Sequence, residues 1–349
     1  MTKLQRAAVL AAGLTIFSLS GDADAFSVPK ASVVSGQSFL FGRPLSRKCS
    51  TFSATTSATS TSVEEPLSTA EAKKLALKKQ IRAEGGPFAF NTKYGALNPY
   101  GIYYGLVSIV LGIAWLVALL GVQFLYAITG NRFDKLRQLP IFFSHIWGVL
   151  SLVLTGSWPK FENAELLKEF YKKKKAAMFV ANHNSWMDIP FLGASIGWRN
   201  YKIVAKAELG KVPILGKSIK LGGHVMVDRT DRRSQLRTFK SGMQWLKDGV
   251  HLCTFPEGTR SRSGRLQKFK NGAFKMAHKR GAPIVPISII GSAKCMPSHF
   301  MFPIRPARGV CKVIIHEPIE SEGKTEEELV EQVKASIISG LPEEQRPAK

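Results

Sequence analysis

The chain has 349 residues, 45% of them hydrophobic, which allows one or two domains with a substantial core. Its formal net charge of +24 predicts anionic partners, such as nucleic acid, an anionic membrane surface or a phosphorylated substrate. No zinc-finger spacing, basic heptad helix or RNP-like aromatic strand accompanies this charge, so we expect no nucleic-acid partner.

The first 65 residues have the composition of targeting segments. Residues 1–25 form a signal-like segment with a basic start, an apolar stretch from Ala7 to Leu19 and small residues before Phe26. Residues 26–65 are rich in Ser and Thr and are predicted to be transit-peptide-like and disordered. This order resembles the bipartite presequences of algae whose plastids are bounded by extra membranes, and it predicts a plastid (chloroplast) envelope or inner membrane. A plain secretory leader with a Ser/Thr linker, and hence the endoplasmic reticulum, is the alternative.

Residues 66–98 are predicted to be a basic amphipathic flank, and residues 99–158 a membrane-associated two-helix segment. Residues 66–98 include a basic amphipathic helix that ends at a Gly pair. Residues 99–158 contain two apolar runs, Ile102–Ile128 and Ile141–Trp158, joined by a polar link that Pro140 closes. The first run would form a helix of about 40 Å, against a hydrocarbon core of about 30 Å. We therefore expect a helical hairpin at the membrane, which either spans the bilayer with tilt or lies in one leaflet.

Residues 159–340 alternate short apolar runs with amphipathic stretches, which predicts an α/β domain with a mostly parallel sheet flanked by helices. No further run is long enough to span a membrane, which argues against a transporter. Residues 324–340 form an amphipathic helix and residues 341–349 a polar tail. The four cysteines (Cys49, Cys253, Cys295 and Cys311) show no CxxC or metal spacing, so we expect free thiols and no metal site.

A histidine and an aspartate follow the first of these strands. In "ANHNSWMDIP" they are His183 and Asp188, five positions apart. A histidine can accept a proton from a substrate hydroxyl near neutral pH, and a carboxylate can orient its ring. The spacing suits this pairing if His183 lies in a turn and Asp188 in the first helical turn. The pattern alone also fits a helix cap and an unrelated loop histidine.

A second loop, "FPEGTRSRSG" (255–264), follows another strand with Glu257, Gly258, Thr259 and Arg260. Guanidinium groups and the backbone N–H groups of a Gly turn bind phosphate, so we expect a phosphate monoester here. Glu257 is predicted to orient Arg260 or a substrate hydroxyl. Arg229 follows a third strand and would add a basic group, although a surface salt bridge explains it equally well. In a parallel sheet, loops at the carboxyl ends of strands form one site.

Four sequence blocks stand in the order found in the glycerolipid acyltransferases: "NHNSWMD", "KAELGKVPILG" with "GGHVMVDR", "FPEGTRSRSG" and "APIVPISI". The chain resembles the bacterial and plastid type of 1-acyl-sn-glycerol-3-phosphate (lysophosphatidate) acyltransferase over about residues 176–290, with the hairpin upstream also as in that family. The resemblance implies the glycerolipid acyltransferase fold with an N-terminal two-helix membrane motif. Asn184 stands where relatives often have Gln, a change that we expect to be tolerated.

The same resemblance implies the roles of individual residues. His183 becomes the general base and Asp188 its orienting partner. Glu257, Gly258, Thr259 and Arg260 come to the glycerol-phosphate site with Arg229 nearby. Supporting positions, partly on the acyl side, are Asn182, Ser185, Lys206 and Pro286.

The resemblance further implies an enzyme that acylates the sn-2 hydroxyl of lysophosphatidic acid to give phosphatidic acid. The acyl donor is acyl-CoA or acyl-carrier protein, the reaction proceeds without a covalent enzyme intermediate, and no cofactor is required. The expected partners are thus a lipid bilayer, lysophosphatidic acid and an acyl thioester. A lysophospholipid or lysocardiolipin remodelling acyltransferase is the alternative, and a non-enzymatic basic membrane protein accounts for the charge and the hairpin but not for the four blocks.

Overall fold

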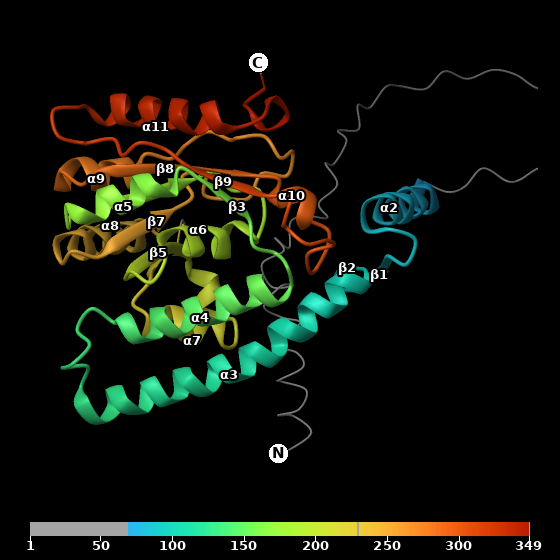
Figure 1. Cartoon of the computed structure of the whole chain (residues 1–349), viewed down its shortest axis with the longest axis horizontal. Helices are drawn as coiled ribbons and strands as arrows, with labels where there is room; N and C mark the ends of the chain where they lie inside the picture. Colours follow the sequence, from blue (N-terminus) through green and yellow to red (C-terminus); the bar gives the residue numbers. More distant parts are fainter. Residues whose placement is uncertain (1–68, 229, 349) are drawn as a thin grey trace, which may run out of the picture.

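A computed structural model describes residues 69–228 and 230–348, and its centre is a seven-stranded sheet (Figure 1). The predicted presequence segments 1–25 and 26–65 lie outside the described residues. The strands stand in the order β3-β9-β8-β4-β7-β5-β6. Their bounds are β3 Lys160–Glu162, β4 Met178–Ala181, β5 Tyr201–Lys206, β6 Val225–Val227, β7 His251–Thr254, β8 Ile284–Ile290 and β9 Lys312–Ile315.

Five neighbouring strands, β8, β4, β7, β5 and β6, run parallel, so their carboxyl ends meet at one edge. β9 pairs antiparallel with β8, and β3 pairs parallel with β9. The predicted mostly parallel α/β sheet is therefore correct. β4 lies in the middle of the sheet, and the loop that follows it lies between the loops that follow β7 and β8.

Helices cover both faces of the sheet because successive residues of its buried strands point to opposite sides. Phe179 of β4 packs in one cluster with side chains of α4 (Gln138–Leu154), α5 (Ala164–Lys172) and α6 (Asp188–Ile196). Met178 and Val180 pack in a second cluster with side chains of α8 (Arg232–Lys247), α9 (Gly272–Arg280) and α11 (Glu326–Gly340). Shorter elements complete the domain: η2 Ala207–Lys211, α7 Leu215–Leu221, α10 Ser292–Cys295 and η3 Glu343–Gln345.

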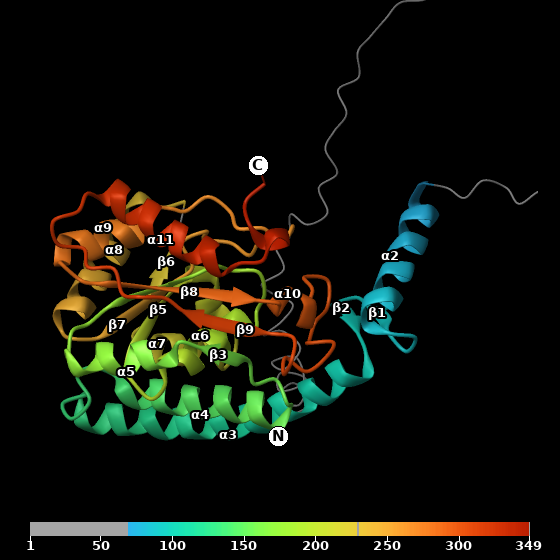
Figure 2. The ribbon, with the colours of Figure 1, turned by 45° about the horizontal axis from the view of Figure 1, so that its top comes forward.

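The predicted hairpin consists of α3 (Pro99–Thr129) and α4, which lie side by side below the sheet (Figures 1 and 2). Asn98 caps the start of α3 by accepting a hydrogen bond from the Gly101 N–H, and Gly130 ends it in the left-handed region with φ 61°. The indole rings of Trp115 and Trp147 stack between the two helices with centroids 4.8 Å apart. Among the described helices, α3 alone is long and apolar enough to cross a membrane.

A small unit precedes the hairpin. It contains the predicted basic helix, α2 (Thr69–Gly85), and a two-stranded sheet of β1 (Phe90–Thr92) and β2 (Gly95–Leu97) that we did not predict. Ile81 of α2 and Ala96 of β2 are buried with Phe300 and Ile304 of the segment between α10 and β9. This contact attaches the unit to the α/β domain beside α10 (Figure 2).

Two further details were not expected. α4 begins at Gln138, before Pro140, which is tolerated because the first helical turn does not need that N–H. The predicted polar tail is partly packed on the domain, since the Leu266 N–H donates to the Gln345 carbonyl at 2.8 Å and the Gln345 side chain is buried.

Candidate active site

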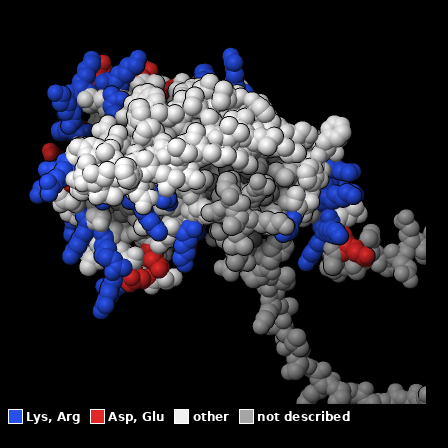
Figure 3. All heavy atoms as spheres, turned by 90° about the horizontal axis from the view of Figure 1, so that it is seen from below, with Lys and Arg blue, Asp and Glu red and all other residues white. Residues whose placement is uncertain are grey.

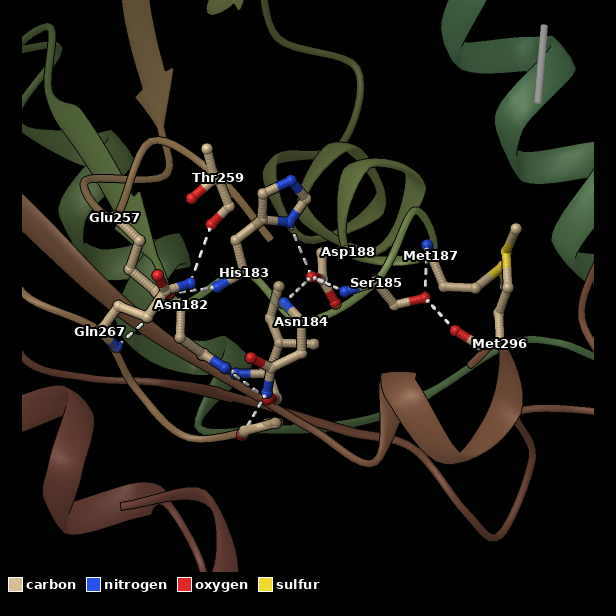
Figure 4. Close-up of polar contacts among 12 residues, drawn as sticks. Asn182, His183, Asn184, Ser185, Met187, Asp188, Glu257, Thr259, Gln267 and Met296 are labelled. Atoms are coloured by element: carbon tan, nitrogen blue, oxygen red, sulfur yellow. Dashed lines mark hydrogen bonds and ion pairs between the residues drawn. The ribbon is translucent and has the colours of Figure 1, made fainter. Parts of the chain in front are cut away.

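The loop between β4 and α6 carries His183, and α6 begins at Asp188 (Figure 4). Asp188 therefore lies in the first helical turn, and its carboxylate reaches back to the loop. Its Oδ2 lies 2.8 Å from the His183 Nδ1 and also accepts the backbone N–H groups of Asn184 and Ser185, at 2.6 and 2.7 Å. One carboxylate oxygen of Asp188 thus both orders the loop and orients the imidazole.

The surroundings of His183 and Asp188 determine which nitrogen of the imidazole carries the hydrogen. Asp188 is fully buried, whereas the His183 side chain keeps 14% of its surface exposed. Because a carboxylate only accepts hydrogen bonds, Nδ1 of His183 carries the hydrogen and Nε2 keeps a free lone pair. The ring also stacks on Phe255 with centroids 4.1 Å apart, which fixes its plane. The arrangement leaves Nε2 as a proton acceptor on a partly exposed ring.

Glu257, from the loop after β7, holds the backbone of His183. Its Oε1 accepts the His183 N–H at 2.6 Å, and its Oε2 accepts the Gln267 N–H at 2.9 Å. The His183 carbonyl in turn accepts the Ser261 N–H at 2.8 Å. Both polar groups of the His183 peptide unit are therefore bound by one neighbouring loop. We predicted that Glu257 orients Arg260 or a substrate hydroxyl, and these bonds give it a further role in positioning His183.

Burial raises the pKa of Glu257 to about 7, and the nearby negative charge of Asp188 adds to the increase. The two backbone N–H groups oppose this change because they stabilise the carboxylate form. Glu257 therefore changes its protonation state near neutral pH while it is in contact with the residue proposed as the base.

In the part of the loop that follows Glu257, Thr259 lies beside His183 (Figure 4). Gly258 has φ 79°, a left-handed conformation that favours glycine and turns the chain back. The Gln267 side chain donates to the Thr259 carbonyl at 3.4 Å, and the Arg260 guanidinium lies 5.1 Å above the Trp186 ring. The loop thus places Thr259 beside His183 and a guanidinium over Trp186, three positions after that histidine.

The supporting residues occupy different positions. Asn182 exchanges two hydrogen bonds with the backbone of Ile289 in β8, at 2.7 and 2.9 Å, which joins the ends of two strands. The Ser185 hydroxyl donates to the Met296 carbonyl at 3.0 Å. Pro286 is buried within β8, opposite Val180 of β4. Lys206 ends β5, two strands away from β4, and the predicted Arg229 lies outside the described residues.

Three contributors to the site were not predicted from the sequence. Phe255 begins the second loop with an apolar side chain, and Gln267 lies ten positions after Glu257, without a recognisable motif. Trp186 stands between His183 and Asp188, and a large aromatic side chain in a polar loop after a strand is the signal that could have identified it.

An apolar cavity lies between the hairpin and the catalytic domain, next to this site. Trp186 and Met187 of the His183–Asp188 loop form part of its wall. α3 and α4 contribute Tyr104, Trp115, Ile141, His145 and Trp147, and β5 and the segment after it contribute Tyr201, Ile203, Ala205, Leu209 and Leu215. An apolar chain is the kind of ligand that such a wall accommodates.

The sequence comparisons agree with this geometry. The family model described as acyltransferase matches residues 159–290, which include both loops. An uncharacterised acyltransferase of Schizosaccharomyces pombe is 31% identical over 258 residues, which are 72% of this chain and 81% of that protein. The chain belongs to the acyltransferase family.

Other members of the acyltransferase family have more specific names. A chloroplastic 1-acyl-sn-glycerol-3-phosphate acyltransferase of Arabidopsis thaliana is 34% identical over 206 residues, 59% of this chain and 55% of that relative. The chain covers only 55% to 61% of the length of three algal and plant relatives at this level of identity. The crystal structure of the 1-acyl-sn-glycerophosphate (LPA) acyltransferase PlsC from Thermotoga maritima matches with a TM-score of 0.55 and 27% identity, over 69% of this chain and 95% of that one.

Proposed function

We propose that this protein acylates the sn-2 hydroxyl of lysophosphatidic acid from an acyl thioester and so produces phosphatidic acid. The observation that carries the proposal is the His183–Asp188 pair at the end of the central strand, held by the "FPEGTR" loop. The names of the 34% identical relatives and of the bacterial structure support the choice of acceptor.

In this mechanism, Nε2 of His183 takes the proton of the acceptor hydroxyl as its oxygen attacks the thioester carbonyl. Asp188 stabilises the imidazolium that forms, because its Oδ2 is bound to the Nδ1 hydrogen. When the tetrahedral intermediate collapses, the carbon–sulfur bond breaks and the thiolate receives the proton. Every step uses side-chain groups and the acyl thioester, so we expect no further cofactor.

The acceptor phosphate would bind at the loop that follows Glu257, where Thr259 lies beside His183 and the Arg260 guanidinium lies over Trp186 of the neighbouring loop. The acyl chain would enter the apolar cavity, whose wall begins at Trp186 and Met187 of the catalytic loop. Both substrates would then meet at the imidazole.

We further propose that the hairpin lies in one leaflet of a membrane and does not cross it. α3 packs along α4 and also contacts α7 of the catalytic domain, for example through the 2.6 Å hydrogen bond from Lys217 to Gln123. A spanning orientation would bring charged groups of the domain into hydrocarbon. Seen from the α3 side, the molecule has a broad area free of charged side chains, with lysines and arginines at its margins (Figure 3). That pattern suits an anionic membrane surface.

The chloroplastic relatives and the composition of residues 1–65 favour a plastid membrane as its location. A fluorescent protein fused behind residues 1–62 tests this point, with plastid fluorescence as the expected result. Fluorescence restricted to the endoplasmic reticulum would favour the secretory alternative.

Acceptor choice distinguishes the proposed reaction from phospholipid remodelling. Membranes that contain the recombinant protein are incubated with a labelled acyl donor and one of three acceptors: lysophosphatidate, glycerol 3-phosphate or lysophosphatidylcholine. The donor is acyl-CoA in one series and acylated acyl-carrier protein in the other. We expect transfer to lysophosphatidate and little to glycerol 3-phosphate or lysophosphatidylcholine. A preference for lysophosphatidylcholine would support the remodelling enzyme, and no transfer to any acceptor would contradict both enzymatic functions.

A further inference from the structure

Two buried cysteines outside the active site lie side by side. Cys295 is the last residue of α10, Cys311 directly precedes β9, and their Sγ atoms are 3.2 Å apart. They are 0% and 2% exposed. The other described cysteine, Cys253, is buried separately within β7.

The backbone around this pair is closely packed. A Cβ added to Gly291 would lie 2.3 Å from the Val310 carbonyl oxygen, so the chain before Cys295 touches the chain before Cys311. The Cys311 N–H donates to Ala307 at 2.7 Å. A disulfide requires a sulfur–sulfur distance of about 2.05 Å, so the two Sγ atoms need to approach by only about 1.2 Å.

We propose that Cys295 and Cys311 form a reversible intramolecular disulfide that closes the segment 296–310 into a loop. The inference concerns the stability of the fold and does not depend on the proposed acyl transfer. It also changes our expectation from the sequence, which treated all four cysteines as separate free thiols.

The chemistry is thiol–disulfide exchange with a small-molecule disulfide such as oxidised glutathione. The thiolate of one cysteine attacks the reagent, one reagent thiolate leaves, and the second cysteine then attacks the mixed disulfide and releases the other. Two protein thiols are oxidised and one reagent disulfide is reduced to two thiols. The Cys311 hydrogen bond and the charge of Arg305 lower the pKa of the Cys295 thiol, and burial opposes this change. The pKa of Cys311 is raised by that same hydrogen bond and by burial.

The loop that the disulfide would close connects three parts of the molecule. Phe300 and Ile304 pack on the α2 unit, and Phe302 packs against Tyr104 of α3 with ring centroids 6.4 Å apart. Met296, next to Cys295, accepts the hydrogen bond from Ser185 of the catalytic loop. Oxidation would therefore stabilise the segment to which the hairpin, the α2 unit and the catalytic loop are attached.

The first test needs no substitution. The full-length protein is incubated with oxidised glutathione, its remaining thiols are blocked, and its peptides are identified by mass spectrometry. We expect a peptide linked through Cys295 and Cys311, lost on treatment with dithiothreitol. Recovery of both residues as blocked free thiols would overturn the proposal, as would their linkage to Cys49 or to glutathione alone.

Thermal unfolding gives a second test with a matched control. Because the disulfide would close the segment 296–310, we expect oxidation to raise the melting temperature by roughly 5–10 °C. The increase should disappear in Cys295→Ala and in Cys311→Ala and persist in Cys253→Ala, which also removes a buried thiol. An equal increase in all three variants would contradict the proposal.

Discussion

His183 is held at its backbone and at its ring by different parts of the chain. Glu257 and Ser261 bind its peptide unit, while Asp188 and Phe255 fix the orientation of the imidazole. Positioning of this kind lowers the barrier of a reaction because the base needs no reorganisation when the proton moves.

We predict that Asp188→Asn lowers the rate of acyl transfer by about 10²-fold or more. An asparagine at this position can present an N–H to Nδ1 and so favour the wrong tautomer, and it loses the charge that stabilises the imidazolium. The rate is measured with labelled acyl-CoA and lysophosphatidate. Asp248→Asn, at the end of α8, is the matched control and should keep normal activity. Equal rates in both variants would exclude an orienting role for Asp188.

The raised pKa of Glu257 predicts how the stability of the fold depends on pH. The native pKa is about 7, above the ordinary value of 4.5, so between these values the folded state binds more protons than the unfolded state. The stabilisation is complete below pH 4.5 and is lost as the pH rises through 7. Glu257→Gln cannot titrate, so the unfolding free energy of the wild type minus that of Glu257→Gln should fall between pH 5 and 7.5.

This fall should be on the order of 2–3 kcal/mol, given about 1.4 kcal/mol for each pKa unit. Denaturant unfolding in detergent at several pH values measures it. A difference that is constant or increases with pH would contradict the assigned pKa shift. In addition, Glu257→Gln should lower activity roughly 10-fold or more at pH 8, because its amide group cannot accept both backbone N–H groups.

At residue scale, the sequence allowed the His183–Asp188 pair to be selected because both residues stand close together at a predicted strand end. The positioning role of Glu257 could not be predicted, since it depends on a contact between loops 74 residues apart. Residue type alone indicates no such role, because it says nothing of the backbone N–H groups that the carboxylate oxygens accept.

Between elements, the hairpin is attached to the sheet through a buried charge. Lys202 of β5 is fully buried, and its ammonium donates to the carbonyls of Leu136 and Arg137 in the α3–α4 turn, at 2.9 and 3.1 Å. A third hydrogen bond goes to the Asn200 side chain at 2.9 Å. Burial lowers the pKa of Lys202 to about 7, and the charge of Asp134 partly opposes this change.

We predict that Lys202→Met loosens this attachment. The substitution removes all three Lys202 hydrogen bonds, while the Leu136 carbonyl keeps the Asn200 side-chain N–H at 2.9 Å. Hydrogen bonds to a charged group each contribute about 1.5–3 kcal/mol. Hydrogen exchange of the turn 130–137 should become at least ~10-fold faster, in line with that loss. Lys217→Met is the control, since Lys217 contacts α3 from an exposed position at Gln123. Equal protection of the turn in both variants would mean that Lys202 does not hold it.

At element scale, each long apolar run became the predicted strand or helix, because its length and apolar composition are local properties of the sequence. Three short strands were missed: β1, β2 and β3 have three residues each and few fully buried positions. The antiparallel direction of β9 also escaped prediction, since a strand pattern contains no information on direction.

On the scale of the whole molecule, the net charge and the apolar hairpin have a common explanation. Val110, Val117 and Phe124 of α3 are each more than 60% exposed and recur every seven residues, so they lie on one face. Exposed apolar area of this extent on a folded protein indicates a binding surface. The lysines and arginines at its margins suit anionic headgroups (Figure 3).

We predict that Val117→Glu with Phe124→Glu weakens membrane binding roughly 10-fold or more, because apolar contact is lost and charge must enter the interface. Sedimentation with vesicles that contain phosphatidylglycerol measures the bound fraction. Leu236→Glu is the control, since Leu236 is exposed on α8, which covers the other face of the sheet. Unchanged binding of the double variant would exclude this face as the membrane contact.

The most direct test of the central claim is the rate of acyl transfer to lysophosphatidate by His183→Ala in purified membranes. If Nε2 of His183 takes the proton of the acceptor hydroxyl, the rate should fall by about 10²–10⁴-fold, while membrane binding and thermal stability stay close to those of the wild type. Retention of near wild-type activity by His183→Ala would show that this histidine is not the base.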